Sequence, residues 1–326
     1  NFNTLNTSLA LNQDLSVITK GLSLKALVNF KNWSETSYTR SIKSNIYKVK
    51  DGSYNPETGE YDYQLLQTGD QFLSQSGISR NSDQTFYFDA RLDWKRSFGD
   101  HNLTAMAMYM MREYRSDVLP NRNQGYSGRV TYDYASKYLV EFNFGYNGSE
   151  RLAAGQRFEF FPAVSAGWVA SSEKFWEPIS KYINHFKIRG SYGLVGSDAF
   201  ASGAPHFLYQ NNIGIGSAHK FWTGLPTSEI SKQGPGFYVL AVQDAGWEHV
   251  KKFDIGFDMM LFNQLNITFD YFHDKRERIL MSRASWPSML GYWGSKPWSN
   301  IGEVENQGFE LSLNWTKQFG KALTLG

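Results

Sequence analysis

The chain has 326 residues, 16% of them aromatic, and a formal net charge of +2 at pH 7. So high an aromatic content excludes a disordered chain, and so small a charge provides no field that would attract nucleic acid. The sequence contains no cysteine, which excludes disulfide scaffolds, cysteine-bound zinc or iron–sulfur centres and thiol catalysis. The longest apolar stretches, such as 105–111 and 163–170, are well short of the roughly 18 residues of a membrane-spanning helix.

Alternation of apolar and polar residues with a period of two is the dominant pattern. Its clearest case is 86–95, where Phe, Phe, Ala, Leu and Trp at even positions alternate with mostly charged residues at odd positions. We predict about twelve strands: 3–14, 21–35, 83–98, 101–115, 125–135, 137–150, 158–170, 184–197, 247–262, 264–279, 306–317 and the beginning of another from 321. Most of these exceed the usual five or six residues of globular sheets and suit a tilted membrane-spanning strand.

The connections between these strands alternate in length. Short turns are expected at 15–20, 99–100, 136, 171–183, 263 and 318–320, and longer loops at 36–82, 116–124, 151–157, 198–246 and 280–305. A soluble sandwich has no reason to sort its loops in this way, whereas outer-membrane barrels do. The pattern therefore predicts an all-β fold, an antiparallel transmembrane β-barrel with long extracellular loops and short periplasmic turns.

Aromatic residues recur where predicted strands meet short turns: Trp94, Phe98, Tyr134, Tyr138, Trp168, Phe262, Trp315 and Phe319. This position fits an interfacial girdle, in which amphipathic rings lie at the level of the lipid headgroups. Ordinary β-propensity is the alternative explanation, because aromatic residues favour strands in any sheet.

Several motifs resemble one family, the SusC/RagA-like TonB-dependent outer-membrane transporters of Bacteroidota. They are Gly128-Arg129-Val130 with Tyr132-Asp133-Tyr134, the run FGYNGS at 144–149, the run FPAVSAGW at 161–168, RGSYG at 189–193, Trp247-Glu248 with KFDIGFD at 252–258, and Asn300-Ile301-Gly302 with NQGFE at 306–310. The resemblance covers nearly the whole chain.

The resemblance implies a 22-stranded barrel that encloses an N-terminal plug, of which this chain would contribute about twelve strands. We therefore expect 1–326 to be a partial barrel domain and an internal piece of a longer protein, with the plug and the barrel ends outside it. The family imports large nutrients, oligosaccharides or peptides, across the outer membrane of Gram-negative Bacteroidota. Its partners are a SusD-like surface lipoprotein, the TonB complex that acts on the plug segment, and outer-membrane lipid.

Charged residues gather on the polar sides of the predicted strands. Burying so many charges in a dry core would cost several kcal/mol each unless they were paired, whereas a hydrated lumen accepts them. We predict that these residues face the lumen: Asp89, Arg91, Asp93, Arg129, Arg189, Asp254 and Asp258.

Aromatic residues in the two late loops are candidates for contact with substrate or a partner. They are Phe221, Trp222, Trp286, Tyr292, Trp293 and Trp298. Aromatic faces pack on sugar C–H surfaces and on peptide side chains; the alternative is that they pack on each other or on a lid protein.

The remaining motifs give no catalytic or metal site. In 51–60, Asp51, Ser53 and Asn55 have the first spacings of a calcium loop, but Pro56 occupies the position of the required glycine, and a hairpin tip at 55–59 is favoured. The six histidines form no metal-binding pair, GxSxG does not occur, and the glycines at 190, 193 and 196 lie within a strand. We expect no cofactor and no enzymatic activity.

Two other functions stay open at this point. One is an outer-membrane binding or adhesion barrel without energised uptake, and the other is a soluble carbohydrate-binding β-protein. A plug upstream in the full gene product would exclude the first, and partition into membranes would exclude the second.

Overall fold

The computed structural model describes residues 2–117, 119–200, 204–216, 220–223, 230–283, 285, 287, 289, 297–319 and 323–325. Almost all regular structure in this part of the chain is β-strand. Two single-turn 3-10 helices, η1 (Ala170–Ser172) and η2 (Lys174–Trp176), follow one another in a turn. None of the helices in the described residues is long and apolar enough to cross a membrane.

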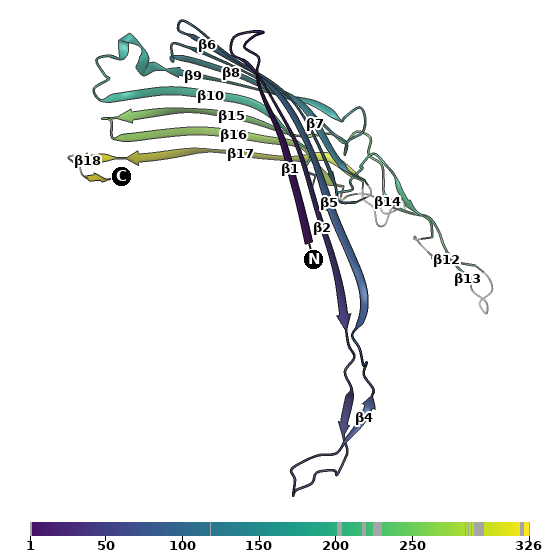
Figure 1. Ribbon diagram of the computed structural model, residues 1–326. Helices are drawn as coiled ribbons and strands as arrows, with labels where there is room; N and C mark the ends of the chain where they lie inside the picture. The colour runs from purple at the N-terminus through teal and green to yellow at the C-terminus, as the bar shows by residue number, and fades with distance from the viewer. Residues whose placement is uncertain are drawn as a thin grey trace. The chain divides into compact units, whose positions relative to one another are not determined.

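Within the described residues, eleven strands form one sheet in the order β1-β2-β5-β6-β7-β8-β9-β10-β15-β16-β17. Figure 1 shows β8, β9, β10, β15, β16 and β17 side by side. The eleven strands are β1 (Phe2–Asp14), β2 (Leu22–Ser41), β5 (Ser74–Phe98), β6 (His101–Arg115), β7 (Asn121–Tyr134), β8 (Tyr138–Ser149), β9 (Phe158–Val169), β10 (Ile183–Ser197), β15 (Glu248–Leu261), β16 (Leu265–Ser282) and β17 (Trp298–Trp315).

Short strands form four further two-stranded sheets among the described residues. They are β3 (Ile46–Val49) with β4 (Tyr63–Gln67), β11 (Asn212–Gly214) with β14 (Gly236–Val239), β12 (Lys220–Thr223) with β13 (Ile230–Gln233), and β18 (Lys317–Phe319) with β19 (Leu323–Leu325). The first lies in the connection between β2 and β5, and the next two lie in the long connection between β10 and β15.

The chain divides into two units. Unit 1 comprises Asn1–Thr7, Asn29–Phe86 and Tyr114–Pro120, and unit 2 comprises Ser8–Val28, Tyr87–Glu113 and Asn121–Gly326. In unit 1, β3 and β4 form an extended hairpin, and every residue of the two strands is exposed. Its tip confirms the predicted turn at 55–59, because Gly59 N donates to Asn55 O at 2.8 Å and Glu57 N to Asn55 Oδ1 at 3.0 Å.

In unit 2 the strand register separates an apolar face from a polar face. One row across the apolar face consists of Tyr138, Trp168, Ile188, Phe257, Phe269 and Leu311. The adjacent row on the other face runs from Leu139 through Gly167, Arg189, Gly256 and Asp270 to Glu310. Since each row pairs residues directly opposite one another, the predicted alternation is confirmed across six strands.

The apolar face of β15–β17 ends at a row of charged side chains. Lys251, Lys275 and Glu305 are register partners, and Glu277 binds both Lys251 Nζ (2.6 Å) and Lys275 Nζ (2.8 Å). Between this row and Leu261 the outward residues of β15 are apolar. From 253 to 261 the strand covers about 27 Å, which a tilt of about 40° reduces to about 21 Å, near the height of a barrel's apolar band.

Two tight turns without glycine join neighbouring strands of the large sheet. Ala135 and Ser136 join β7 to β8, and Phe262 and Asn263 join β15 to β16; all four have φ between 51° and 57°. Residues with a side chain adopt this left-handed conformation infrequently, and here pairing of the strands on both sides of each turn stabilises it.

The longer turn after β9 is fastened by Glu173, to which Tyr138 Oη and Lys137 Nζ donate at 2.8 Å and 3.1 Å. These donors hold the pKa of Glu173 below its ordinary value, so the contacts weaken only as the pH falls through that lowered pKa.

The structure confirms eleven of the predicted strands and corrects several of their ends. β2 continues to Ser41, β5 begins at Ser74 and β17 begins at Trp298, so parts of two predicted loops, 36–82 and 280–305, are strand. The reason is that hydrogen bonding to a neighbouring strand continues beyond the stretch in which apolar residues alternate. The expected twelfth strand, β19, pairs with β18 as a separate hairpin within the described residues.

The two faces generate a direct test. Because the resemblance places the apolar face against lipid, Ile255→Arg should destabilise the full-length barrel by about 2–4 kcal/mol near the midplane of the bilayer. Ser191→Arg, on the polar face beside Asp254, should cost far less. Urea unfolding of both variants in lipid vesicles measures the difference, and equal losses would contradict the assignment of the faces.

Candidate functional site

Arg189 of β10 binds three aspartates at the centre of the polar face. Its guanidinium nitrogens lie 3.5 Å from Asp254 Oδ1, 3.2 Å from Asp258 Oδ2 and 2.7 Å from Asp270 Oδ2. Asp254 and Asp258 flank Gly256, which is opposite Arg189 on β15, and Asp270 is opposite Gly256 on β16. One cation thus joins three strands while two carboxylate charges stay uncompensated.

Gly256 makes this arrangement possible because, having no side chain, it leaves room above its Cα for the Asp270 carboxylate. A Cβ at this position would lie 2.0 Å from Asp270 Oδ1 and 2.5 Å from the carbonyl oxygen of Phe269. The Asp270 carboxylate therefore lies across Gly256 and reaches Arg189 from the next strand.

Three of the other four predicted polar-face residues, Arg91, Asp93 and Arg129, also form ion pairs. Arg129 of β7 binds Glu141 of β8 at 2.5 Å. Asp93 of β5 is bound by Arg91 of the same strand at 3.0 Å and by Lys25 of β2 at 3.6 Å. Asp89, also on β5, is half-buried. The register places Arg129, Arg189, Asp254 and Asp258 on one face; that this face lines a lumen stays a prediction.

A hollow of about 490 Å³ lies on the polar face between β7 and β15. The hollow forms where the side chains are small: β9 contributes Ser165 and Gly167, and β10 contributes Ser191. Charged side chains that line it are Asp133, Glu141, Lys187, Arg189 and Asp254.

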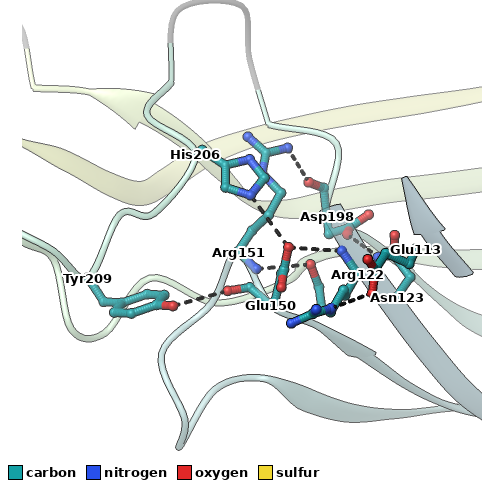
Figure 2. Close-up of polar contacts among 9 residues, drawn as sticks. Glu113, Arg122, Asn123, Glu150, Arg151, Asp198, His206 and Tyr209 are labelled. Atoms are coloured by element: carbon teal, nitrogen blue, oxygen red, sulfur yellow. Dashed lines mark hydrogen bonds and ion pairs between the residues drawn. The ribbon is translucent and has the colours of Figure 1, made fainter. Parts of the chain in front are cut away.

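A second cluster, centred on Glu150, joins the loop after β10 to the ends of β7 and β8. Figure 2 shows Glu150 between Arg122 and two residues of that loop, His206 and Tyr209. Arg122 N donates to Glu150 Oε1 at 2.9 Å, and His206 Nε2 lies 3.7 Å from the same oxygen. Tyr209 Oη donates to the Glu150 carbonyl at 3.4 Å, so the backbone of Glu150 binds the loop directly, and its carboxylate adds an ion pair when His206 is protonated.

Asp198 and Arg151 add a second link between the same segments (Figure 2). Asn123 Nδ2 donates to Asp198 Oδ2 at 2.9 Å, and Arg151 Nη1 donates to the Asp198 carbonyl at 3.0 Å. The Arg151 guanidinium also lies 4.5 Å from the centre of the Phe200 ring. Burial lowers the pKa of Arg151 and the charge of Asp198 partly offsets this, yet arginine stays protonated.

The largest fully buried apolar side chains of the described residues lie beneath this loop. One cluster contains Leu152, Phe161 and Trp247, and another contains Leu208, Ala245 and Leu280. The Asn300 side chain accepts from Gly246 N at 3.0 Å and donates to the carbonyls of Gly246 and Arg278. These contacts fix the end of the long loop on β16 and β17.

Hydrogen bonds also close the long loop on itself above this base. Val242 N donates to Leu208 O at 2.7 Å, Ala241 N donates to Asn211 Oδ1 at 2.8 Å, and Gln243 Nε2 donates to Tyr209 O at 2.9 Å. We call this pairing of 208–211 with 241–243 the neck of the loop.

The structure places only three of the six aromatic loop candidates. Phe221 and Trp222 lie in β12, and the Trp222 side chain is 62% exposed. Trp298 is the first residue of β17, not part of a loop as predicted, and packs half-buried against the Leu208–Leu280 cluster. Trp286, Tyr292 and Trp293 lie outside the described residues.

Sequence reasoning missed Asp270 and the loop-base residues Glu150, Arg151 and Asp198. Alternation in the strand at 264–279 could have found Asp270, because it shares the parity of Thr268 and Asp274. No signal could have linked Asn123 to Asp198, which are 75 positions apart. No metal-binding group of three or more His, Asp or Glu occurs in the described part of the chain.

A family model described as TonB dependent receptor-like, beta-barrel, matches residues 2–326. The chain belongs to this family. The resemblance to SusC- and RagA-like receptors is thereby confirmed, and the TonB-dependent receptor barrel is an outer-membrane protein. The family is one of receptors and transporters rather than enzymes.

Curated relatives agree with this assignment. TonB-dependent receptor P3 of Formosa agariphila is 32% identical over 188 residues, which are 57% of this chain and 17% of that protein. TonB-dependent receptor SusC of Bacteroides thetaiotaomicron is 23% identical over 301 residues, 88% of this chain and 26% of that protein. The receptor barrel described here thus spans about a quarter or less of these relatives.

Solved structures show the same fold. The RagAB peptide importer in its open-open state gives a TM-score of 0.67 at 18% identity, covering 98% of this chain and 35% of that chain. The siderophore receptor PirA from Acinetobacter baumannii gives 0.54 at 11% identity, covering 98% and 43%.

Gly256 provides a test of the Arg189 cluster. Gly256→Ala should destabilise the full-length receptor by about 1–3 kcal/mol, because the new methyl group displaces Asp270 and meets the Phe269 backbone. Gly190→Ala is the control, since a Cβ there meets only Asp254 O at an ordinary 3.6 Å. Urea unfolding in vesicles compares the two, and equal stability would contradict the packing described.

Glu150 provides a test of the loop base. Removing a largely buried acceptor costs about 1–3 kcal/mol, so Glu150→Ala should speed protease cleavage within 198–246 about tenfold or more. Glu305→Ala is the matched control, because its pair with His273 at 2.6 Å is 60% exposed on the glutamate side. The rates are measured on intact receptor in outer membranes; unchanged cleavage in Glu150→Ala would show that other contacts hold the loop.

Proposed function

We propose that the intact protein to which this barrel belongs imports large nutrients across the outer membrane. The observation that carries the proposal is a TonB-dependent receptor sheet with an apolar outer face and an opposite face that bears a network of ions. Such a face is suited to a hydrated interior through which a large polar solute passes.

In this proposal the chain forms part of the barrel domain, and the plug and the remaining strands belong to other parts of the protein. Asp89, Arg91, Asp93, Arg129, Arg189, Asp254 and Asp258 line the lumen. Energy comes from the TonB complex, which acts on the plug, and no residue of this barrel has a catalytic role.

The proposed substrate is an oligosaccharide or a peptide, captured with a SusD-like surface lipoprotein. Support comes from the relative named SusC and from the fold shared with the RagAB peptide importer. Trp222 supports a contact at the cell surface, because its ring is mostly exposed on a hairpin of the long loop. Phe221, Trp286, Tyr292, Trp293 and Trp298 remain further candidates for this contact.

The decisive experiment uses the full-length protein in its own outer membrane. Affinity purification should recover a surface lipoprotein together with a bound oligosaccharide or peptide. Uptake of that ligand should stop when TonB is deleted, because nothing in the barrel wall can supply the energy. Binding that persists with no TonB-dependent uptake would instead indicate an adhesion barrel.

A further inference from the structure

We propose that the apolar face of β5 and β6, at the end that carries their short turn, binds the headgroup of an anionic phospholipid in the periplasmic leaflet, with Arg96 as the ligand of the phosphate. The inference does not rest on the proposed function, because it is independent of what the receptor imports. It requires that the apolar face meets the lipid of the outer membrane, where this family of barrels resides.

Side-chain hydrogen bonds across the turn between β5 and β6 establish the face on which Arg96 lies. Ser97 Oγ donates to Asn102 Oδ1 at 2.6 Å, and Asn102 Nδ2 donates to Asp133 Oδ1 at 3.3 Å. Asp133 is paired with Leu139, which belongs to the row on the polar face. Arg96 is one position from Ser97, so its side chain lies on the opposite, apolar face.

Arg96 lies at the end of this apolar face, among aromatic residues. Its guanidinium carbon is 4.8 Å from the centre of the Phe98 ring, which is half exposed. Phe98 ends β5 and His101 begins β6, with two turn residues between them. These two residues are therefore opposite each other, with Cα atoms about 5 Å apart. Rings in this position lie at the level of the lipid headgroups.

His101 provides a second donor on the neighbouring strand. Its Nδ1 is 2.7 Å from Tyr132 Oη, and its ring centre is 4.8 Å from that of Tyr134. In the arrangement in which the Tyr132 hydroxyl donates to Nδ1, the neutral ring carries its proton on Nε2. The His101 ring is exposed, so this proton is open to the hydroxyl oxygens of a headgroup whose phosphate is bound by Arg96.

The charge at this edge favours an anionic lipid over a zwitterionic one. Arg96 forms no ion pair in the described part of the chain and lies on the Phe98 ring instead. Asp100, the acidic residue nearest in sequence, lies in the exposed turn beyond the end of the strand. A lipid phosphate would thus supply the charge-assisted hydrogen bonds that no carboxylate supplies to this arginine.

The extracellular edge of the same face is built differently. On β15 and β16, Glu277 binds Lys251 and Lys275 at 2.6 Å and 2.8 Å, so each of these cations already has a carboxylate. An arginine without such a partner is therefore a particular feature of β5, and the charged border of the sheet does not by itself explain it.

A fluorophore on Ala105→Cys measures which lipid occupies the site. Ala105 shares the face of His101 and lies four positions from it, toward the apolar band. The full-length receptor, without other reactive cysteines, is labelled with bimane in vesicles of phosphatidylglycerol and phosphatidylethanolamine, one of which is brominated to quench the label. Quenching should show that phosphatidylglycerol binds about fivefold more tightly, as expected for one arginine near a lipid surface.

Variants of β5 test the role of Arg96. Arg96→Gln should reduce the preference to about one, and Arg96→Lys should retain part of it, because lysine keeps the charge and loses the planar fork. Lys95→Gln is the matched control, since it removes the same charge one residue away on the polar face. It should leave the preference unchanged. An equal fall in Lys95→Gln, or no fall in Arg96→Gln, overturns the proposal.

A second control places the label elsewhere on the apolar face. Phe269→Cys lies four positions from Leu265, which begins β16, just as Ala105 lies four positions from the start of β6. The turn before β16 consists of the uncharged Phe262 and Asn263. The label at this position should show no preference between the two lipids. A preference at Ala105→Cys no higher than at Phe269→Cys overturns the proposal.

Salt keeps the test decisive if the Arg96 variants do not insert into vesicles. Raising sodium chloride from about 0.1 M to about 1 M shortens the screening length from about 10 Å to about 3 Å, so the preference at Ala105→Cys should fall toward one. Inorganic phosphate should lower it no more than chloride of equal ionic strength. A preference that salt leaves unchanged overturns the proposal. Loss of the preference in phosphate alone would show a site for the dissolved ion and would also overturn it.

Discussion

Every long strand of this sheet has to satisfy two different surroundings at the same time, and the rest of the structure depends on this constraint. Because side chains alternate between the two faces of a strand, the row of Trp168, Ile188 and Phe257 lies on one face of the sheet. The neighbouring row, with Arg189 and Asp270, lies on the other face. Neither face needs a packed core of its own. The fully buried apolar side chains of the described residues instead lie at the base of the loops.

The same constraint explains why the fold was largely predictable from the sequence. A period of two is visible in one strand at a time, and so eleven strands were found with errors mainly at their ends. Alternation also predicts that Arg129, Arg189, Asp254 and Asp258 share one face, which the register confirms, because parity needs no knowledge of the neighbouring strand.

What could not be predicted depends on partners that are distant in sequence. Parity places Arg189 on the polar face, yet only the register shows that Gly256 lies opposite it and that Asp270 reaches across. The loop base is harder still, since Glu150 binds residues of a loop about 60 positions later. The sequence around Trp298, rich in Gly, Ser and Pro, predicts a loop, but pairing with Ser282 makes this residue part of a strand.

The neck of the loop after β10 has a consequence for how such receptors diversify. The contacts of 208–211 with 241–243 and of Asn300 with Gly246 hold both ends of the loop on its base. Insertions, deletions and substitutions beyond the neck alter what the loop presents outward, while the eleven-stranded sheet keeps its pairing. The neck therefore marks a boundary between a surface loop whose sequence is free to change and the wall whose strands depend on their register.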